Sequence, residues 1–378
     1  MDMVSMRSKS ILIMIHCDEN TGYAIASLEY VFLEAAKKAG FAEKNIFWSF
    51  KKTITKDSSN IVECNYIDPH SYGNVEKLIK DNNIQIALAF DLGFPCALIP
   101  ALKKAGIKNL ISYWGASMSS INSGIKLLLK RLECLLTVNK PDFFIFESEA
   151  MRKTATHGRG VHQSLTSIVY LGVDTDKFYP IYDQDYYLHD ALDIPRHQKI
   201  IFYSGHMEER KGVRVITNAA IHLIDKLNYS NIHFVVCGNK NHEADAYEKL
   251  LENTKARSQV TFAGYRSDIP KLMRSSYIGV IASTGWDSFT MSSIEMMASG
   301  LPLIVSNLQG LSETIDDNKN GFLIEPGNHI ELAKKIELLI EQPDLAKSFS
   351  KISRQRAESL FAIDIQINKF SKIFMKNA

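Results

Sequence analysis

Two carboxylates flank a polar stretch of the chain whose residue types suit the binding of hydroxyl groups and phosphate. The stretch Trp286–Leu301 (WDSFTMSSIEMMASGL) contains Asp287 and Glu295, eight residues apart. We predict a loop at Asp287, followed by a helix that has Ser292 or the serine after it as its N-cap. The free N–H groups of residues 289–292 would then suit a diphosphate, and the carboxylates would accept hydrogen bonds from sugar or ribose hydroxyls. The alternative is that Glu295 only complements the helix dipole.

A second candidate for phosphate binding is the loop Gly205–Gly212 (GHMEERKG). It follows a predicted strand and precedes a helix predicted to start at about Val213. Such a turn offers backbone N–H groups and the positive end of a helix dipole, and Arg210 and Lys211 add two cations. The alternative is a surface turn with solvated charges.

Two further patterns give weaker signals. Tyr265 and Arg266 follow a short strand that ends at Gly264, and they could line the pocket of a nucleotide base. Two Asp-x-Asp triplets, at 174–176 and 183–185, have the composition of a divalent-metal site on a diphosphate. Because both lie in or near the connection between the two halves of the chain, we expect no metal there.

The segment Ile121–Val138 carries three basic residues among many leucines. Lys126, Lys130 and Arg131 are interspersed with apolar residues at helical spacing. A basic amphipathic helix can lie on an anionic membrane. A helix that packs its leucines on the core and turns a basic face outward fits the pattern equally well.

Composition narrows the class of protein. The length of 378 residues favours two domains. The composition, 46% hydrophobic and 23% charged, is typical of a globular protein. The net charge of +2 gives no global nucleic-acid signature. The five cysteines are scattered and never spaced as Cys-x-x-Cys, so we expect neither disulfides nor a zinc site. A location in the reducing cytoplasm is therefore expected. We recognise no signal peptide and no transmembrane helix.

Apolar strand-like runs alternate with helical segments in both halves of the chain. This alternation predicts two doubly wound parallel sheets, each covered by helices on both faces. The connection between them is predicted at residues 179–197, where Pro180 and Pro195 interrupt the pattern. The predicted strands are Ser10–His16, Asn45–Phe50, Ile84–Phe90, Asn109–Tyr113, Phe143–Glu147, Lys199–Tyr203, Ile232–Cys237, Val260–Ala263, Ile278–Ala282 and Pro302–Val305.

Ligands of open parallel sheets bind beyond the carboxyl ends of the strands. In the first half of the chain, His16, Asp91 and Trp114 stand at or directly after such ends. We therefore expect these three side chains to line a cleft between the two domains.

In this order, the motifs resemble those of the retaining glycosyltransferases of family 4, which have the GT-B fold. The resemblance covers nearly the whole chain and is most specific between about Tyr170 and Ala333. The segments that carry it are LGVDTDKFYP (171–180), GHMEERKG (205–212), VTFAGYRSDIPKLM (260–273), DSFTMSSIEMMASGLPLIVS (287–306) and LQGLSETIDDNKNGFLIEP (308–326).

The resemblance implies a fold and a set of domain boundaries. It implies two Rossmann-like domains that face an interdomain cleft, with the C-terminal helix crossing back to the first domain. The N-terminal, acceptor-side domain would comprise residues 1–180 and the helix at 362–378. The C-terminal domain, at 181–361, would bind the nucleotide sugar.

It also implies roles for individual residues. Lys211 would neutralise the diphosphate leaving group, Glu295 would accept from the ribose hydroxyls, and Asp287 would face the donor sugar; these three form the expected catalytic set. The donor-binding residues would be Gly22, Gly205, His206, Arg210, Lys211, Gly264, Tyr265, Arg266, Asp287, Phe289, Thr290, Met291 and Glu295. His16, Asp91 and Trp114 remain the acceptor-side candidates.

Three positions depart from the family pattern. His206 stands where an arginine is usual, Asp287 where a glutamate is usual, and Trp114 where a histidine is often found. Arg210 is the candidate to replace the missing arginine. Because of these departures, a nucleotide-sugar-binding protein without turnover stays open as an alternative, as does a nucleotide-sugar epimerase of the same fold.

The expected function is transfer of a sugar from a nucleoside-diphosphate sugar to a hydroxyl of a glycan or lipid-linked acceptor. The anomeric configuration would be retained, UDP is favoured over GDP, and neither a metal nor another cofactor is expected. The family's usual setting is bacterial surface polysaccharide synthesis. We therefore expect a cytoplasmic enzyme that does not bind nucleic acid. Contact with the inner membrane face through residues 121–138 stays open as an alternative to core packing of that helix.

Overall fold

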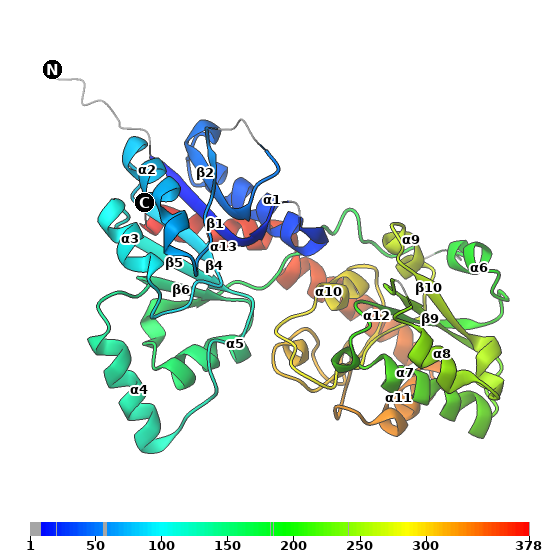
Figure 1. Cartoon of the computed structure of the whole chain (residues 1–378). Coiled ribbons are helices and arrows are strands. Elements are labelled where there is room, and N and C mark those ends of the chain that lie inside the picture. The colour runs from blue at the N-terminus through cyan, green and yellow to red at the C-terminus, as the bar shows by residue number, and fades with distance from the viewer. Residues whose placement is uncertain are drawn as a thin grey trace. The chain divides into compact units, whose positions relative to one another are not determined.

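The computed structural model describes residues 9–19, 21–55, 59–181, 183, 185–240 and 242–377. Contacts along the chain divide it into two compact units (Figure 1). The first comprises residues 1–170 and 364–378, and the second comprises residues 171–363.

The first unit is built on a seven-stranded sheet in the order β3-β2-β1-β4-β5-β6-β7. Every neighbouring pair is parallel, so the chain must cross over between strands, and in the described residues each crossover apart from the β2–β3 connection contains a helix. Strand order reverses between β1 and β4, which makes this the topological switch point of the sheet. The strands are β1 (Ile11–Asp18), β2 (Ile46–Lys52), β3 (Ile61–Glu63), β4 (Ile86–Phe90), β5 (Asn109–Trp114), β6 (Phe143–Phe146) and β7 (Thr166–Ile168).

The central strands of this sheet are buried on both faces. The first five residues of β1, ILIMI, are all inaccessible to solvent, as expected of a continuous apolar run in a parallel sheet. The first unit also contains α-helices. They are α1 (Gly22–Lys38), α2 (Tyr72–Asp81), α3 (Leu98–Ala105), α4 (Gly124–Leu136), α5 (Glu149–Lys153) and α13 (Ile363–Asn377).

The last helix, α13, belongs to the first unit although it follows the second unit in sequence. Phe370 packs edge-on against Phe32 of α1, with ring centroids 5.1 Å apart, and against Tyr113 of β5 at 5.3 Å. Asn109 donates a hydrogen bond to the carbonyl of Asn377 at 2.7 Å. The expectation that the C-terminal helix returns to the first domain is confirmed.

The second unit contains a six-stranded parallel sheet in the order β10-β9-β8-β11-β12-β13, and its switch point lies between β8 and β11. Its strands are β8 (Lys199–Ser204), β9 (Ile232–Cys237), β10 (Val260–Gly264), β11 (Ile278–Ile281), β12 (Leu303–Ser306) and β13 (Gly321–Ile324). Its helices are α6 (Tyr187–Leu192), α7 (Val213–Ile221), α8 (Asp245–Leu251), α9 (Ile269–Arg274), α10 (Met291–Ala298), α11 (His329–Glu341) and α12 (Pro343–Arg356).

The predicted fold class, two doubly wound Rossmann-like domains, is confirmed. The sequence reading missed β3, β7 and β13, which occupy three of the four sheet edges. Each has only three or four residues, too few to show a periodic pattern. Gly22, one of the predicted donor-binding residues, is the first residue of α1 and has a φ of +70°.

Candidate functional site

In the second unit, the loops that follow β8 and β11 meet at the switch point of the sheet. Backbone N–H groups of Thr284 and Gly285 donate to the carbonyl of Arg210 at 2.7 and 3.2 Å. Gly212 has a φ of +77°, and a Cβ on it would stand 1.7 Å from the carbonyl oxygen of Ala282. Only glycine fits where the two loops approach so closely. The loop predicted to bind phosphate is therefore attached to the loop that carries Asp287.

The two loops place Lys211 and Asp287 in direct contact. The Lys211 ammonium lies 3.0 Å from Asp287 Oδ2, and their side chains are only 17% and 5% exposed. Ser283 Oγ donates to the same oxygen at 2.8 Å, and Thr290 Oγ1 donates to Oδ1 at 3.1 Å. Each carboxylate oxygen of Asp287 thus already accepts at least one hydrogen bond. The arrangement holds Lys211 in one orientation and leaves further ammonium N–H bonds for an anion.

Helix α10 begins beside this pair without a side-chain cap. Its N-cap is Thr290, not Ser292 or the residue after it as predicted, and the Thr290 hydroxyl makes no cap hydrogen bond because it bonds to Asp287. The first N–H groups of an α-helix have no partner within the helix. The N-terminus of α10 at Met291 is accordingly suited to an anion, as the sequence predicted.

Glu295 is buried in the second turn of α10. The sequence reading placed it in the first turn, where it could have complemented the helix dipole. Because that interaction fades beyond the first turn, the helix start at Met291 removes this alternative explanation for Glu295.

The guanidinium of Arg210, the candidate to replace a missing arginine, is already bound. Its Nε lies 2.7 Å from Glu208 Oε2, and its Nη1 donates to the carbonyl of Trp286 at 2.9 Å. His206 is exposed, and its carbonyl accepts from the Tyr203 hydroxyl at 2.6 Å. Arg210 thus joins the two loops, whereas the His206 side chain stays accessible.

The residues predicted to lie near a nucleotide base follow β10. Gly264 has a φ of +70°, and its N–H donates to Asn239 Oδ1 at 2.8 Å. Tyr265 is exposed, with the Lys240 ammonium 4.7 Å from its ring centroid. Arg266 forms an ion pair with Asp268 at 2.6 Å, which lowers the pKa of the Asp268 carboxyl and raises that of Arg266.

In the first unit, the three acceptor-side candidates lie at the carboxyl ends of adjacent strands β1, β4 and β5. His16 stacks on Tyr66 with ring centroids 4.4 Å apart, and its Nε2 lies 2.9 Å from Asn65 Oδ1. Asp91 accepts from the Gly115 N–H at 3.0 Å, yet burial raises the pKa of its carboxyl to about 6.

The third candidate, Trp114, contributes a buried donor to the same end of the sheet. Within the described part of the chain, its Nε1 has no hydrogen-bond partner. A carboxyl with a raised pKa and an unsatisfied N–H at one sheet end are typical of a ligand-binding surface.

Sequence reasoning missed two side chains that support the Asp287 loop and helix α10. Gln309 Oε1 accepts from the Asp287 N–H at 2.9 Å. Arg354 Nη1 donates to the carbonyls of Thr175, Phe178 and Ala298, thereby joining the 171–180 segment to the end of α10. Gln309 and Arg354 both act through contacts between residues far apart in the sequence, which no local sequence pattern predicts.

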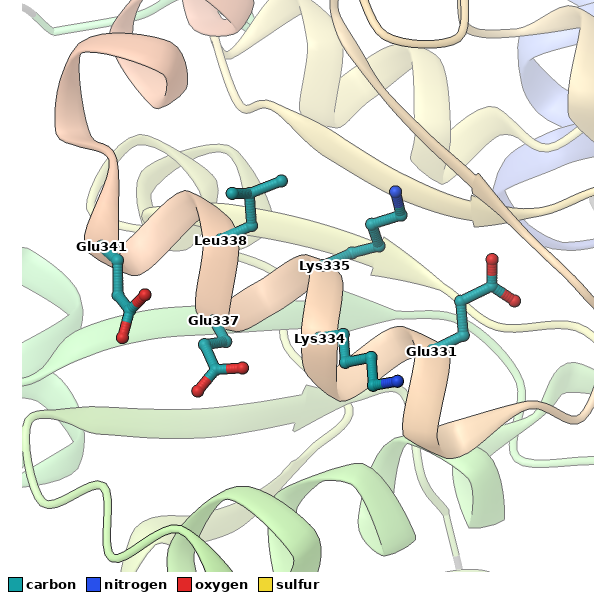
Figure 2. A pocket seen from close by; sticks show the side chains of 6 residues that line it. All are labelled: Glu331, Lys334, Lys335, Glu337, Leu338 and Glu341. Carbon is teal, nitrogen blue, oxygen red and sulfur yellow. The ribbon is translucent and has the colours of Figure 1, made fainter.

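A hollow on α11 is unrelated to these residues. Figure 2 shows that its side chains leave one helix in different directions and do not converge on a point. Glu337 and Glu341 both accept from the hydroxyl of Tyr229. The Lys335 ammonium lies over the ring of Phe322. These contacts stabilise the helix surface and do not form a site.

Over the residues that the structure describes, no three His, Cys, Asp or Glu side chains are grouped as a metal ion would require. Gln184, in the second Asp-x-Asp triplet, lies outside those residues. In the first triplet, Asp174 accepts from the N–H groups of Asp176 and Lys177 at 3.0 Å, which stabilises a turn. Over the same residues, no helix has both the length and the apolarity needed to cross a membrane.

Two parallel sheets, each with a topological switch point and with helices between most of its strands, define a Rossmann-like α/β protein. Residues 188–356, which lie within the second unit, match the family model described as glycosyl transferases group 1. The resemblance inferred from the motifs is confirmed.

One curated relative and two solved structures illustrate the similarity. The N,N′-diacetylbacillosaminyl-diphospho-undecaprenol α-1,3-N-acetylgalactosaminyltransferase of Campylobacter jejuni is 28% identical over 240 residues, which cover 63% of this chain and 59% of that protein. A glycosyltransferase from Rickettsia africae superposes with a TM-score of 0.79 at 20% identity and 98% coverage of both chains. HepE of Anabaena in complex with UDP gives 0.76 at 17% identity, covering 98% of this chain and 100% of that chain.

The structural similarity extends over the whole chain and supports the GT-B glycosyltransferase fold. The sequence similarity is shorter, because the chain spans 62% and 64% of the length of the first two curated relatives it matches.

Proposed function

We propose that this protein transfers a sugar from a nucleoside-diphosphate sugar to a hydroxyl group of a glycan or lipid-linked acceptor. The observation that carries the proposal is the buried Lys211–Asp287 pair beside the uncapped N-terminus of α10. A compensated lysine and a helix N-terminus at one switch point suit the diphosphate that departs when the sugar is transferred.

In the proposed mechanism, the C–O bond between the anomeric carbon and the diphosphate breaks, and negative charge develops on the leaving oxygen. The Lys211 ammonium and the first N–H groups of α10 stabilise that charge, so the proposal includes no metal. Asp287 positions Lys211 and has little capacity left for sugar hydroxyls, because its oxygens accept from Lys211, Ser283 and Thr290. Glu295 is assigned to the ribose hydroxyls.

We propose retention at the anomeric carbon, with the acceptor hydroxyl attacking on the face that the diphosphate leaves and the diphosphate oxygen taking its proton. Asp91 is the alternative base, because burial raises the pKa of its carboxyl to about 6, within reach of neutral pH. Nuclear magnetic resonance of the product, which distinguishes α from β anomers, decides between retention and inversion.

UDP is proposed as the carrier, because HepE, a structural relative over the whole chain, binds UDP. The lipid-linked acceptor is suggested by the Campylobacter relative, whose name specifies a diphospho-undecaprenol substrate. Such an acceptor would require the enzyme to work at a membrane surface. We propose that the enzyme acts on the cytoplasmic side of the membrane, in the synthesis of a bacterial surface polysaccharide.

The test is binding followed by turnover. UDP and GDP are titrated into wild-type protein and Lys211→Ala, and UDP- or GDP-sugars are then incubated with lipid-linked and soluble acceptors. We expect UDP binding that Lys211→Ala weakens, and a glycosylated product. If the protein binds the donor but neither transfers the sugar nor slowly hydrolyses the donor, it is a binding protein without turnover. An epimerised donor would indicate an epimerase. Failure to bind either nucleotide would contradict the proposal.

A further inference from the structure

Helix α4 turns its apolar side away from the domain. Of its thirteen residues, only Cys134 is buried. Ile121 and Val138, just outside the helix, are exposed as well. An apolar surface of this extent on a folded domain marks an interaction site. The exposed apolar residues of the helix, called here the α4 stripe, are Ile125, Leu128, Leu129, Leu132, Leu135 and Leu136.

The α4 stripe occupies one side of the helix. At about 100° per residue, its six members fall within an arc of about 120°. Leu127, half-buried, and Cys134 lie on the opposite side, toward the domain. The sequence left open whether the leucines of this helix pack on the core. The structure shows that most of them do not.

Close packing fixes the orientation of α4. A Cβ on Gly160 would stand 2.5 Å from the carbonyl of Lys130, so the helix backbone rests directly on that glycine. Asn122, just before the helix, donates to the carbonyl of Gly158 at 2.8 Å. Figure 1 shows α4 at the margin of its own domain, away from the sheet. These contacts hold the helix with its stripe turned away from the domain.

Basic side chains flank the α4 stripe. By the same helical geometry, Lys126 lies on one side of it and Arg131 on the other. In the part of the chain that the structure describes, neither has an ion-pair partner, whereas Lys130 pairs with Glu133 at 2.6 Å. Cations beside an apolar stripe match an anionic lipid surface, where acyl chains meet negatively charged headgroups.

The length of α4 defines how it could sit in a bilayer. Thirteen residues span about 20 Å along the axis, whereas a spanning helix needs about 20 residues. A helix of this length with one apolar side lies in the plane of the interface, with its apolar side about 5–10 Å deep.

We propose that the α4 stripe docks the protein on an anionic lipid bilayer, with Lys126 and Arg131 contacting the headgroups. The inference rests on the proposed function only for its purpose, which is to bring the enzyme to a lipid-linked acceptor. Binding to vesicles requires neither donor nor acceptor, so this inference can fail while the glycosyltransferase proposal stands, and the reverse also holds.

The experiment is vesicle flotation with the full-length protein. The vesicles contain phosphatidylcholine alone or phosphatidylcholine mixed with phosphatidylglycerol. The apolar variant is I125Q/L136Q, because these two side chains are 78% and 77% exposed and their replacement removes little packing. Its matched control is I54Q/I67Q, two isoleucines of the same domain that are 67% and 81% exposed.

A second pair of variants tests the charges. K126Q/R131Q removes the flanking cations, and K104Q/K108Q removes two exposed lysines elsewhere in the domain. Thermal melting of every variant checks the fold. The charge variant keeps the proposal testable even if the apolar one unfolds.

We expect wild-type protein to float with the phosphatidylglycerol vesicles. I125Q/L136Q and K126Q/R131Q should each bind about tenfold more weakly, and salt should weaken wild-type binding. The two controls should bind like wild type. Absent wild-type binding, equal losses in the controls, or undiminished binding of both test variants would overturn the proposal. A wild-type dimer that I125Q/L136Q separates into monomers would also overturn it, in favour of an interface between copies.

Discussion

Replacing Asp287 with alanine should destabilise the second unit strongly, because the carboxylate compensates a nearly buried cation. The change leaves the Lys211 ammonium, 17% exposed, without its partner at 3.0 Å, and it removes the acceptor of the Ser283 and Thr290 hydroxyls. Removing one member of a buried ion pair costs about 3–5 kcal/mol. Because Lys211 keeps some contact with water, we take the lower end, about 3 kcal/mol.

That loss translates into a melting shift large enough to measure. For a unit of this size, each kcal/mol corresponds to about 2–4 °C, so Asp287→Ala should lower the melting temperature by about 6–12 °C. The matched control is Asp190→Ala, which removes a carboxylate from an exposed pair with Arg196 at 3.0 Å. Exposed pairs contribute at most about 1 kcal/mol, so this control should melt within a few degrees of wild type.

A double-mutant cycle separates the ion pair from other effects. Lys211→Met alone leaves the Asp287 charge buried without a cation, whereas the double variant K211M/D287A leaves neither charge. We expect a coupling free energy of about 2 kcal/mol between the two sites. If Asp287→Ala melts like Asp190→Ala, or if the two substitutions add without coupling, the ion pair does not organise the site and our reasoning is wrong.

Three further predictions rest on single residues. Gly212→Ala should cost at least about 2 kcal/mol in urea unfolding and weaken UDP binding, because its Cβ would meet the Ala282 carbonyl; normal stability and affinity would contradict the close contact. Burial lowers the pKa of His233 to about 4, so the free energy of unfolding should fall by about 3 kcal/mol as the pH drops from 6.5 to 4, and His233→Gln should lose this dependence in urea titrations. If Asp91 acts as the base, the transfer rate should decline as the pH falls through about 6, the pKa of its buried carboxyl. The Asp91→Asn variant should lose this decline from the pH–rate profile and still bind UDP. An unchanged decline in the variant would exclude Asp91 from proton transfer.

The His233 prediction follows from the direction of its pKa shift. Its ring bridges Gln198 Oε1 at 3.0 Å and Thr261 Oγ1 at 2.8 Å within the second unit. The pKa in the folded protein lies below the unfolded value, so the unfolded state binds the proton first as pH falls. The contribution to stability is therefore complete above pH 6.5 and is lost as the pH falls toward 4.

Much of the fold was predictable because its signals are local. A buried parallel strand such as Ile232–Cys237 is a continuous apolar run, and the structure has the same bounds as predicted. The start of α7 at Val213 was predicted from the glycine-bearing loop before it. The short edge strands and the N-cap at Thr290 were not predicted, because tertiary contacts, not local residue preference, define them.

The sequence alone determined the residue types of the site: a loop with Lys211, a loop with Asp287 and a helix start after it. Only the tertiary structure decided that Lys211 and Asp287, 76 residues apart, form an ion pair. The pair exists because β8 and β11 are neighbours at the switch point of the sheet, and a sequence pattern carries no information on which strands are adjacent. The α4 stripe shows the same division between sequence and tertiary structure. The residue spacing predicted an amphipathic helix, and the packing of that helix on Gly160 decided which face meets the solvent.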